Sequence, residues 1–275
     1  MNVIDTFRLN EIENERISYH KFFPKIAHIE EQITFLNNLF QGLIKKQNNL
    51  DKTLEENQLA IVILGSKLIR SSICELNLIK QGYYLEADSI LRNFLEITAL
   101  IEYFSLKPEA ALKWLHGKEI HYSAALQGII EDRKKLLNLL EGIGASRSIA
   151  LQNLIDEEKA SHKNWKISEK NLYGFLCNTL HPNFKGFLSL IKLKGLPEDE
   201  IQISLNEKFS FIDTGMLLIF LSVYLNSSIK TTMTAMEPFF SSENEKKNFT
   251  KLNRKTKRMA RYWIKNFDKK KGKRR

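Results

Sequence analysis

Apolar residues recur at steps of three and four over most of the chain, which is the spacing of one face of an α-helix. Between residues 26 and 43, isoleucine, leucine and phenylalanine follow one another at intervals of 3, 4, 3, 4 and 3. The middle of residues 54–80 is apolar almost all round, so we expect this segment at the centre of the fold. Residues 211–236 predict another long apolar helix, which ends before Pro238. The pattern therefore predicts an all-α fold, a multi-helix bundle.

The pattern is most informative over Gly82–Phe104, which predicts a helix with a charged pair inside an otherwise apolar surface. Gly82 separates it from the helix over 54–80, so the two are expected to form an antiparallel hairpin at the centre of the bundle. Arg92 and Glu96 are one turn apart and can form an ion pair. That pair is either a solvated surface pair or a partly buried pair that lines a pocket.

Prolines, glycines and capping signals divide the rest of the pattern. Pro24 is expected to interrupt the first helical stretch, and a single helix is predicted over 108–140. Residues 195–208 are the least regular and predict a short strand or a loop. Ser242 and Glu245 have the spacing of a capping box and predict the start of the last helix. The predicted units are N-terminal helices (1–53), a helical core domain (54–240) and a basic C-terminal helix with a disordered tail (241–275).

Composition places the chain among ordinary globular proteins. It has 275 residues, of which 43% are hydrophobic and 27% charged. The two cysteines, Cys74 and Cys177, lie far apart and form no Cys-x-x-Cys motif, which fits a reducing compartment. The N-terminus shows no signal peptide, and Met216–Leu225, the most apolar run, is about half the length of a membrane-spanning helix. We therefore expect a cytoplasmic protein that has no membrane partner.

The net charge of +10 is unevenly distributed. Residues 246–275 hold fifteen Lys and Arg residues and one acidic residue, a net charge of +14, whereas the preceding 245 residues hold 27 basic and 31 acidic residues, a net charge of −4. An apolar stripe (Phe249, Leu252, Thr256, Met259, Trp263 and Phe267) is expected to dock this helix on the body. The tail Lys269–Arg275 is expected to be disordered.

The basic residues around that stripe predict binding to nucleic acid through its phosphates, with RNA favoured over DNA. Two alternatives remain open: the charge serves only solubility and nonspecific contacts, or it binds an acidic protein. A homodimer is also left open. The candidate nucleic-acid-binding residues are Lys251, Arg254, Lys255, Lys257, Arg258, Arg261, Lys269, Lys270, Lys271, Lys273, Arg274 and Arg275.

The sequence contains no His-Glu-x-x-His motif, no His, Cys and carboxylate cluster at ligand spacing, and no glycine-rich phosphate-binding loop. No metal and no cofactor is therefore expected. Besides Gly82–Phe104, a second motif lies near residue 180. There the sequence YGFLCNTLHP predicts a helix that ends at His181 before Pro182. A histidine at a helix end is also favoured by the helix dipole alone, so His181 has a purely structural interpretation as well.

Together the two motifs resemble the bacterial domain-of-unknown-function family 5677. The resemblance covers about residues 50–230 and implies a bacterial helical bundle without an established activity, similar to the HEPN domains, some of which cut RNA in toxin–antitoxin and phage-defence systems. The chain departs from HEPN ribonucleases because no histidine follows an arginine at the spacing they use. The residues that carry the resemblance are Gly82, Tyr83, Glu86, Ala87, Arg92, Glu96, Tyr173, Asn178, His181 and Pro182.

Two functions follow as expectations. In the first, the chain is an RNA-binding or RNA-processing module of a defence or toxin type and, if it is an enzyme, a metal-independent ribonuclease. His181 would be its general acid and base, Arg92 would hold the phosphate and Glu96 would orient Arg92, with Asn178 and Tyr173 beside them. In the second, the chain is a non-catalytic interaction module in which the same residues hold the bundle together.

Overall fold

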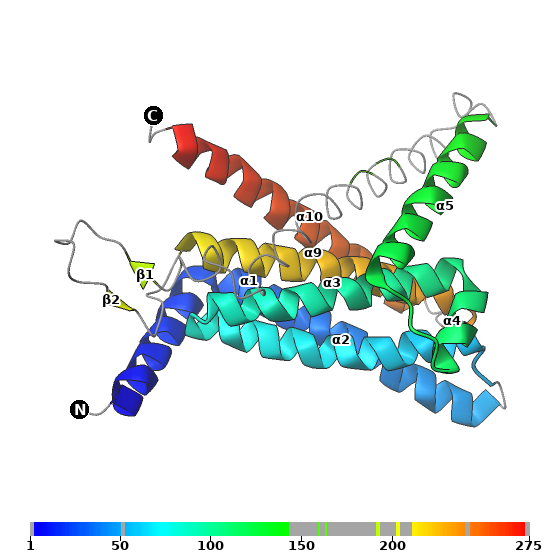
Figure 1. Ribbon diagram of the computed structural model, residues 1–275, viewed down its shortest axis with the longest axis horizontal. Helices are drawn as coiled ribbons and strands as arrows, with labels where there is room; N and C mark the ends of the chain where they lie inside the picture. Colours follow the sequence, from blue (N-terminus) through cyan, green and yellow to red (C-terminus); the bar gives the residue numbers. More distant parts are fainter. Residues whose placement is uncertain are drawn as a thin grey trace.

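The computed structural model describes residues 3–50, 53–142, 159, 163, 191–192, 202–203, 211–239 and 243–272. Its centre is a ring of four helices: α1 (Val3–Leu50), α2 (Glu56–Gln81), α3 (Tyr84–Leu106) and α9 (Phe211–Ala235). Each packs on two neighbours, α1 on α2, α2 on α3, α3 on α9 and α9 on α1. Figure 1 shows the four running along the long axis of the molecule. The predicted all-α multi-helix bundle is confirmed.

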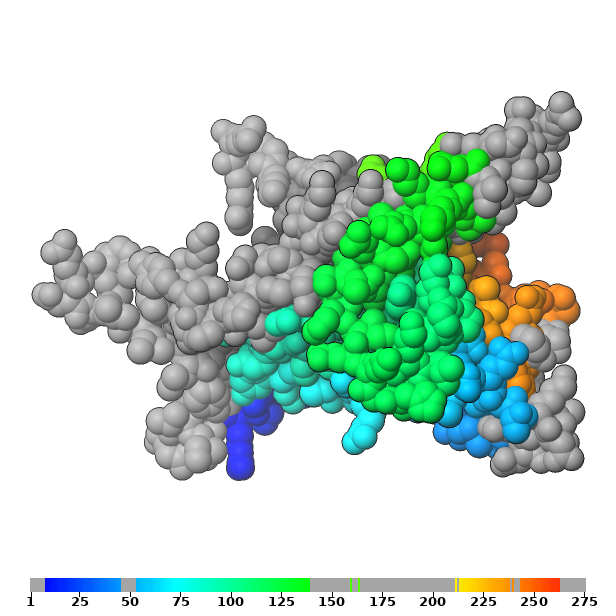
Figure 2. All heavy atoms as spheres, turned by 45° about the vertical axis from the view of Figure 1, so that its right-hand side comes forward, coloured from blue at the N-terminus to red at the C-terminus, as the bar shows by residue number. Residues whose placement is uncertain are grey.

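Three further helices surround the ring. The short α4 (Pro108–Leu115) packs on α2 and α3, α5 (Tyr122–Gly142) packs on α3, and α10 (Glu243–Gly272) packs on α9 and α1. Figure 2 shows α4 and α5 in green on one face of the bundle. In Figure 1, α5 and α10 leave the bundle on the same side and diverge.

The small elements lie between α5 and α10 in the sequence. The strands β1 (Ile191–Lys192) and β2 (Gln202–Ile203) pair antiparallel, with Ile191 opposite Ile203. The strand β2 falls within the segment for which the sequence left a strand or a loop open. The 3-10 helix η3 (Glu237–Phe239) follows α9.

The core is made by the faces that the apolar spacing predicted. Leu95 on α3 is completely buried, as predicted, and the core cluster takes residues from α1, α2, α3 and α9. The N-terminal helix therefore shares one core with the central hairpin. On α1 the whole predicted stripe is buried: Ile26, Ile29, Ile33, Leu36, Phe40 and Leu43.

The predicted hairpin of α2 and α3 is confirmed, and its turn depends on Gly82. This residue has a φ of 87°, in the left-handed region that glycine adopts without steric cost. The amide of Tyr83 donates to the carbonyl of Leu78 at 2.9 Å, which satisfies a helix-end carbonyl. At the other end of α2, the side chain of Gln58 accepts from the amide of Glu55 at 3.0 Å, as part of a capping box.

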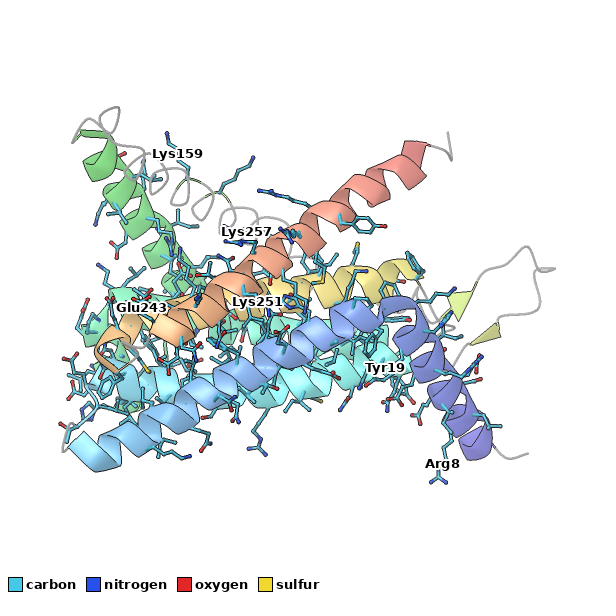
Figure 3. All side chains as sticks on the ribbon, turned by 180° about the vertical axis from the view of Figure 1, so that it is seen from behind. Arg8, Tyr19, Lys159, Glu243, Lys251 and Lys257 are labelled. Carbon is cyan, nitrogen blue, oxygen red and sulfur yellow. The ribbon has the colours of Figure 1, made fainter. Side chains whose placement is uncertain are left out.

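Two breaks were predicted wrongly. The helix α1 continues through Pro24 and bends in that region, as Figure 3 shows from behind. Proline removes one backbone donor and kinks a helix, but Phe22 and Ile26 are fully buried on either side and hold the chain in place. The helix predicted over 108–140 is instead divided into α4 and α5. Gly117 separates them with a φ of 81°, a conformation incompatible with a continuous right-handed helix.

The C-terminal end also differs from the prediction. The helix α10 continues through Gly272, so residues 269–272, which were expected to be disordered, are helical. Residues 273–275 and Ser242 of the predicted capping box lie outside the described residues.

The helix α9 is long and apolar enough to cross a membrane if length and composition alone are considered. Half of the apolar window is buried inside the bundle. Leu218, Leu221, Leu225 and Ile229 are completely buried in contact with the neighbouring helices. These contacts give α9 the role of a core helix in this fold.

Candidate nucleic-acid interface

The inner face of α10 docks on the bundle. Leu252 and Thr256 are each only 3% exposed, and Phe249 and Met259 are half-buried. This confirms the predicted docking stripe as far as Met259; the side chains of Trp263 and Phe267 lie outside the described residues. Because the apolar residues of α10 are used for docking, its basic residues are left for the opposite face.

A buried polar network holds α10 in place. The Thr256 hydroxyl donates to the Leu252 carbonyl at 3.1 Å and accepts from Gln32 Nε2 at 3.1 Å. The hydroxyl oxygen also lies 2.8 Å from His28 Nε2. Because the only proton of the hydroxyl is donated to the Leu252 carbonyl, the oxygen accepts a hydrogen bond from the imidazole. Gln32 also donates to the Ser222 carbonyl at 3.0 Å and accepts from the Ser222 hydroxyl at 2.8 Å. One cluster thus joins α1, α9 and α10.

His28 is neutral in this network. Burial, with a smaller contribution from the nearby ammonium of Lys255, lowers its pKa from 6.5 to about 4. A neutral imidazole protonated on Nε2 matches the acceptor that Thr256 presents. His28 and Gln32 were not predicted to have a role, although they lie one turn apart on the apolar face of α1. Two polar residues inside an otherwise apolar stripe could have indicated a buried hydrogen-bond network.

The outer face of α10 carries the predicted cations. Lys255 forms an ion pair with Glu31 of α1, with Nζ 2.8 Å from Oε2. Within the described part of the chain, no ion-pair partner is found for the other predicted cations whose side chains are described: Lys251, Arg254, Lys257, Arg258 and Arg261. Figure 3 marks Lys251 and Lys257 along the helix. The predicted cations whose side chains are described are all exposed: Lys251, Arg254, Lys255, Lys257, Arg258 and Arg261.

Not all predicted cations can be placed. The side chains of Lys269, Lys270 and Lys271 lie outside the described residues, as do Lys273, Arg274 and Arg275 entirely. Two of the three acidic residues of α10, Glu243 and Glu245, are in its first turn, where the helix dipole favours negative charge, and the third is Asp268 near its end. The positive charge of the helix therefore begins after that turn, at Lys246.

The candidate catalytic cluster is only partly described. Arg92 Nε lies 3.2 Å from Glu96 Oε1 within α3, and the two side chains are 29% and 31% exposed. The pair is thus partly buried, as in the second alternative that the sequence left open, and a pocket beside it stays a prediction. Tyr173, Asn178 and His181 lie outside the described residues, so the proposed approach of His181 to Arg92 stays a prediction.

A buried carboxylate on α2 was not predicted from the sequence. Glu75 of α2 is completely buried, and neither of its carboxylate oxygens has a hydrogen-bond partner among the residues that the structure describes. Burial, together with the negative charge of Asp88 across the hairpin, raises its pKa well above 4.5. Glu75 lies seven residues after the buried Leu68 and four before the buried Ile79. This spacing places it on the same helix face and could have predicted an inward-facing side chain.

The helix α5 is attached by charged pairs. The guanidinium of Arg133 donates to the buried carboxylate of Glu102 on α3. Beside it, Lys107 Nζ lies 2.9 Å from Asp132 Oδ2, and this contact raises the pKa of Lys107. The Arg133 pair satisfies a carboxylate that is only 2% exposed, and the two pairs join the middle of α5 to α3 and to Lys107, which follows α3.

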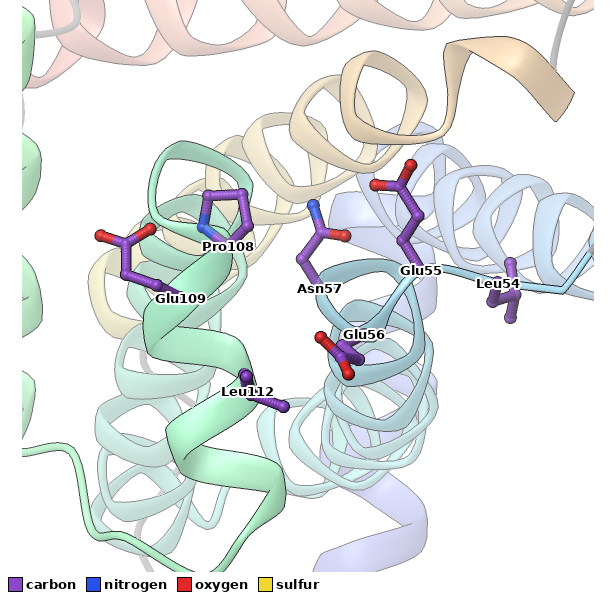
Figure 4. Close-up of a pocket in the computed structure, with 7 residues that line it drawn as sticks. All are labelled: Leu54, Glu55, Glu56, Asn57, Pro108, Glu109 and Leu112. Carbon is purple, nitrogen blue, oxygen red and sulfur yellow. The ribbon is translucent and has the colours of Figure 1, made fainter.

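A pocket of about 410 Å³ lies between the beginnings of α2 and α4, and Figure 4 shows its lining. Three of the lining residues are acidic: Glu55, Glu56 and Glu109. Negative charge repels phosphate, so this pocket is unsuited to nucleic acid. Neither Arg92 nor Glu96 lines it.

Comparison with known proteins gives no relative for this chain: no family model, curated protein or solved structure matches it.

Proposed function

We propose that this chain is a nucleic-acid-binding module, with RNA as its favoured ligand, that holds phosphates on the outer face of α10. The observation that carries the proposal is the separation of the two faces of that helix. Its apolar residues and Thr256 dock on α1 and α9, while Lys251, Arg254 and Arg258 are exposed without an ion-pair partner in the described structure. Cations with no partner of their own keep their full charge for a polyanion.

The affinity should depend steeply on salt. If about six phosphates are neutralised, the logarithm of the association constant should fall with the logarithm of salt concentration with a slope of roughly −4 to −5. Fluorescence anisotropy with a labelled RNA oligonucleotide at several salt concentrations measures this slope. A slope near zero would contradict phosphate binding.

Charge reversal tests which surface is used. The double substitution Arg254→Glu/Arg258→Glu should weaken RNA binding and reduce the salt slope by about 1.5–2, because two phosphate contacts are lost. The matched control is Lys67→Glu/Arg70→Glu, an identical charge change at two exposed residues of α2. Equal loss in the two variants would show that only net charge matters. Removal of α10 is less suitable, because it would uncover the buried His28 and Gln32.

RNA processing is the finer form of the proposal. The resemblance to a family with ribonuclease relatives favours it, together with a defence or toxin role in a bacterium. The contrasting function, a non-catalytic interaction module, is favoured by the Arg92–Glu96 pair, which forms within one helix and requires no ligand. An RNA cleavage assay of the wild type, Arg92→Ala and His181→Ala separates the two. Equal activity in all three would leave the pair with a structural role.

A further inference from the structure

An exposed stripe of side chains runs along α2 on the side that faces away from the core. Leu59, Ile63 and Ile73 of this stripe are 43%, 46% and 48% exposed, so one helix leaves three large apolar side chains nearly half open to solvent. All members of the stripe are exposed and follow one another at steps of three and four, which keeps them on one face. The stripe consists of Glu56, Leu59, Ile63, Ser66, Arg70, Ile73 and Asn77.

The two charged residues of the stripe have opposite signs and lie on either side of Ile63. Glu56 is seven residues before Ile63, and Arg70 is seven residues after it. Seven residues make two helical turns, so the three side chains point the same way. Lys67, also exposed, adds a second positive charge on the side of Arg70. Within the described part of the chain, no ion pair uses any of these three charges.

Such a face is complementary to a second copy of itself. In a two-fold dimer both copies use the same surface, and residues at equal distances on either side of the axis meet. If two α2 helices lie antiparallel with the axis at Ile63, the two Ile63 side chains pack on each other. Glu56 of each copy then lies opposite Arg70 of the other, so one charge pair forms twice. A parallel arrangement would instead place like charges opposite each other.

The pocket between α2 and α4 lies at the acidic end of the stripe. Glu56 lines this pocket together with Glu55 and Glu109, as Figure 4 shows. In the antiparallel arrangement, Arg70 of the other copy would therefore meet three carboxylates. A nucleic acid or an anionic membrane would meet the same carboxylates, which disfavours a polyanion as the occupant of this face.

We propose that two copies of this chain associate through the outer faces of their α2 helices, antiparallel about a two-fold axis at Ile63. The helix α10 packs on α9 and α1, and Figure 1 shows α2 on the other side of the bundle. The dimer therefore leaves the basic faces of both α10 helices on its outer sides. This inference does not depend on the proposed function.

The first test measures the mass of the chain by size-exclusion chromatography with light scattering over a range of concentrations. The wild type should reach twice the mass of one chain as its concentration rises. Ile63→Glu places two carboxylates at the axis and should keep the chain monomeric. The matched control is Leu136→Glu on α5, where the leucine is 41% exposed, and it should dimerise like the wild type. Circular dichroism should show unchanged helix content in both variants, because both side chains are exposed.

The second test exchanges the charges. Arg70→Glu places a carboxylate opposite Glu56, and Glu56→Arg places a guanidinium opposite Arg70. Each variant alone should raise the dissociation constant of the dimer by about tenfold or more, because two attractions become two repulsions. An equimolar mixture of the two variants should dimerise as tightly as the wild type, because each carboxylate again meets a guanidinium. Recovery in the mixture separates charge pairing from damage to the fold.

A wild type that stays monomeric at every concentration would overturn this inference, as would a dimer that Ile63→Glu leaves intact. Failure of the mixture to dimerise would overturn the antiparallel pairing. The proposed function is tested separately, because a short RNA oligonucleotide occupies one α10 face at a time. Loss of the dimer should therefore leave the affinity for that oligonucleotide unchanged.

Discussion

Thr256→Val is the most direct test of how α10 is attached. Valine has nearly the shape of threonine, so the substitution removes the hydroxyl and leaves the packing in place. Two buried donors then lose their acceptor: His28 Nε2, 2.8 Å from the hydroxyl, and one hydrogen of Gln32 Nε2, at 3.1 Å. At about 1–3 kcal/mol for each unsatisfied buried group, we expect the free energy of unfolding to fall by about 2–6 kcal/mol.

The same helix offers the control. The Thr250 hydroxyl donates to the Lys246 carbonyl at 2.8 Å, as Thr256 does to Leu252, but Thr250 is exposed and water can replace it. Thr250→Val should therefore change the free energy of unfolding by less than about 0.5 kcal/mol. Urea unfolding followed by far-ultraviolet circular dichroism measures both variants. If they differ by less than about 0.5 kcal/mol, the buried network does not secure α10.

Three further outcomes are expected from urea unfolding. The raised pKa of Glu75 means that the folded state keeps a proton that the unfolded state releases. The free energy of unfolding should therefore fall as pH rises above 4.5, by at most about 1.4 kcal/mol per pH unit. Glu75→Gln should flatten this trend. His28 should have the opposite effect, because its pKa is about 4 in the folded state and 6.5 in the unfolded state. The free energy of unfolding should fall as pH falls from 6.5 towards 4, and His28→Gln should remove that loss. Leu95→Ala should cost about 2–5 kcal/mol, whereas Leu136→Ala, at a side chain that is 41% exposed, should cost far less; similar values for the two would contradict the core position of Leu95.

The helices were predictable because each must bury one face, and the residues of a buried face are apolar at steps of three and four. The stripe from Ile26 to Leu43 is buried throughout for this reason. The breaks were harder, because a proline or glycine acts against the packing of its neighbours. At Pro24 the burial of adjacent residues maintains the helix, whereas at Gly117 the backbone enters the left-handed region and the helix ends.

The candidate interface divides in the same way. The basic face of α10 follows from amphipathic spacing within a short segment, so the sequence predicted its exposed cations. The network of His28, Gln32 and Thr256 joins residues up to 228 positions apart, and no local pattern encodes such a pairing. The burial of Glu75 was not predicted, because a carboxylate is almost never fully buried without a partner. Its position in the structure is what shows that it is.

The contact between α1 and α10 joins two segments that the ribosome makes far apart in time. His28 and Thr256 are 228 residues apart, an interval of about 10–45 s at typical rates of translation. The ring also needs α9, so the apolar stripe of α1 must wait for most of the chain before it is covered. During that interval α2 and α3 are the partners available to α1, and premature association with other nascent chains is the hazard.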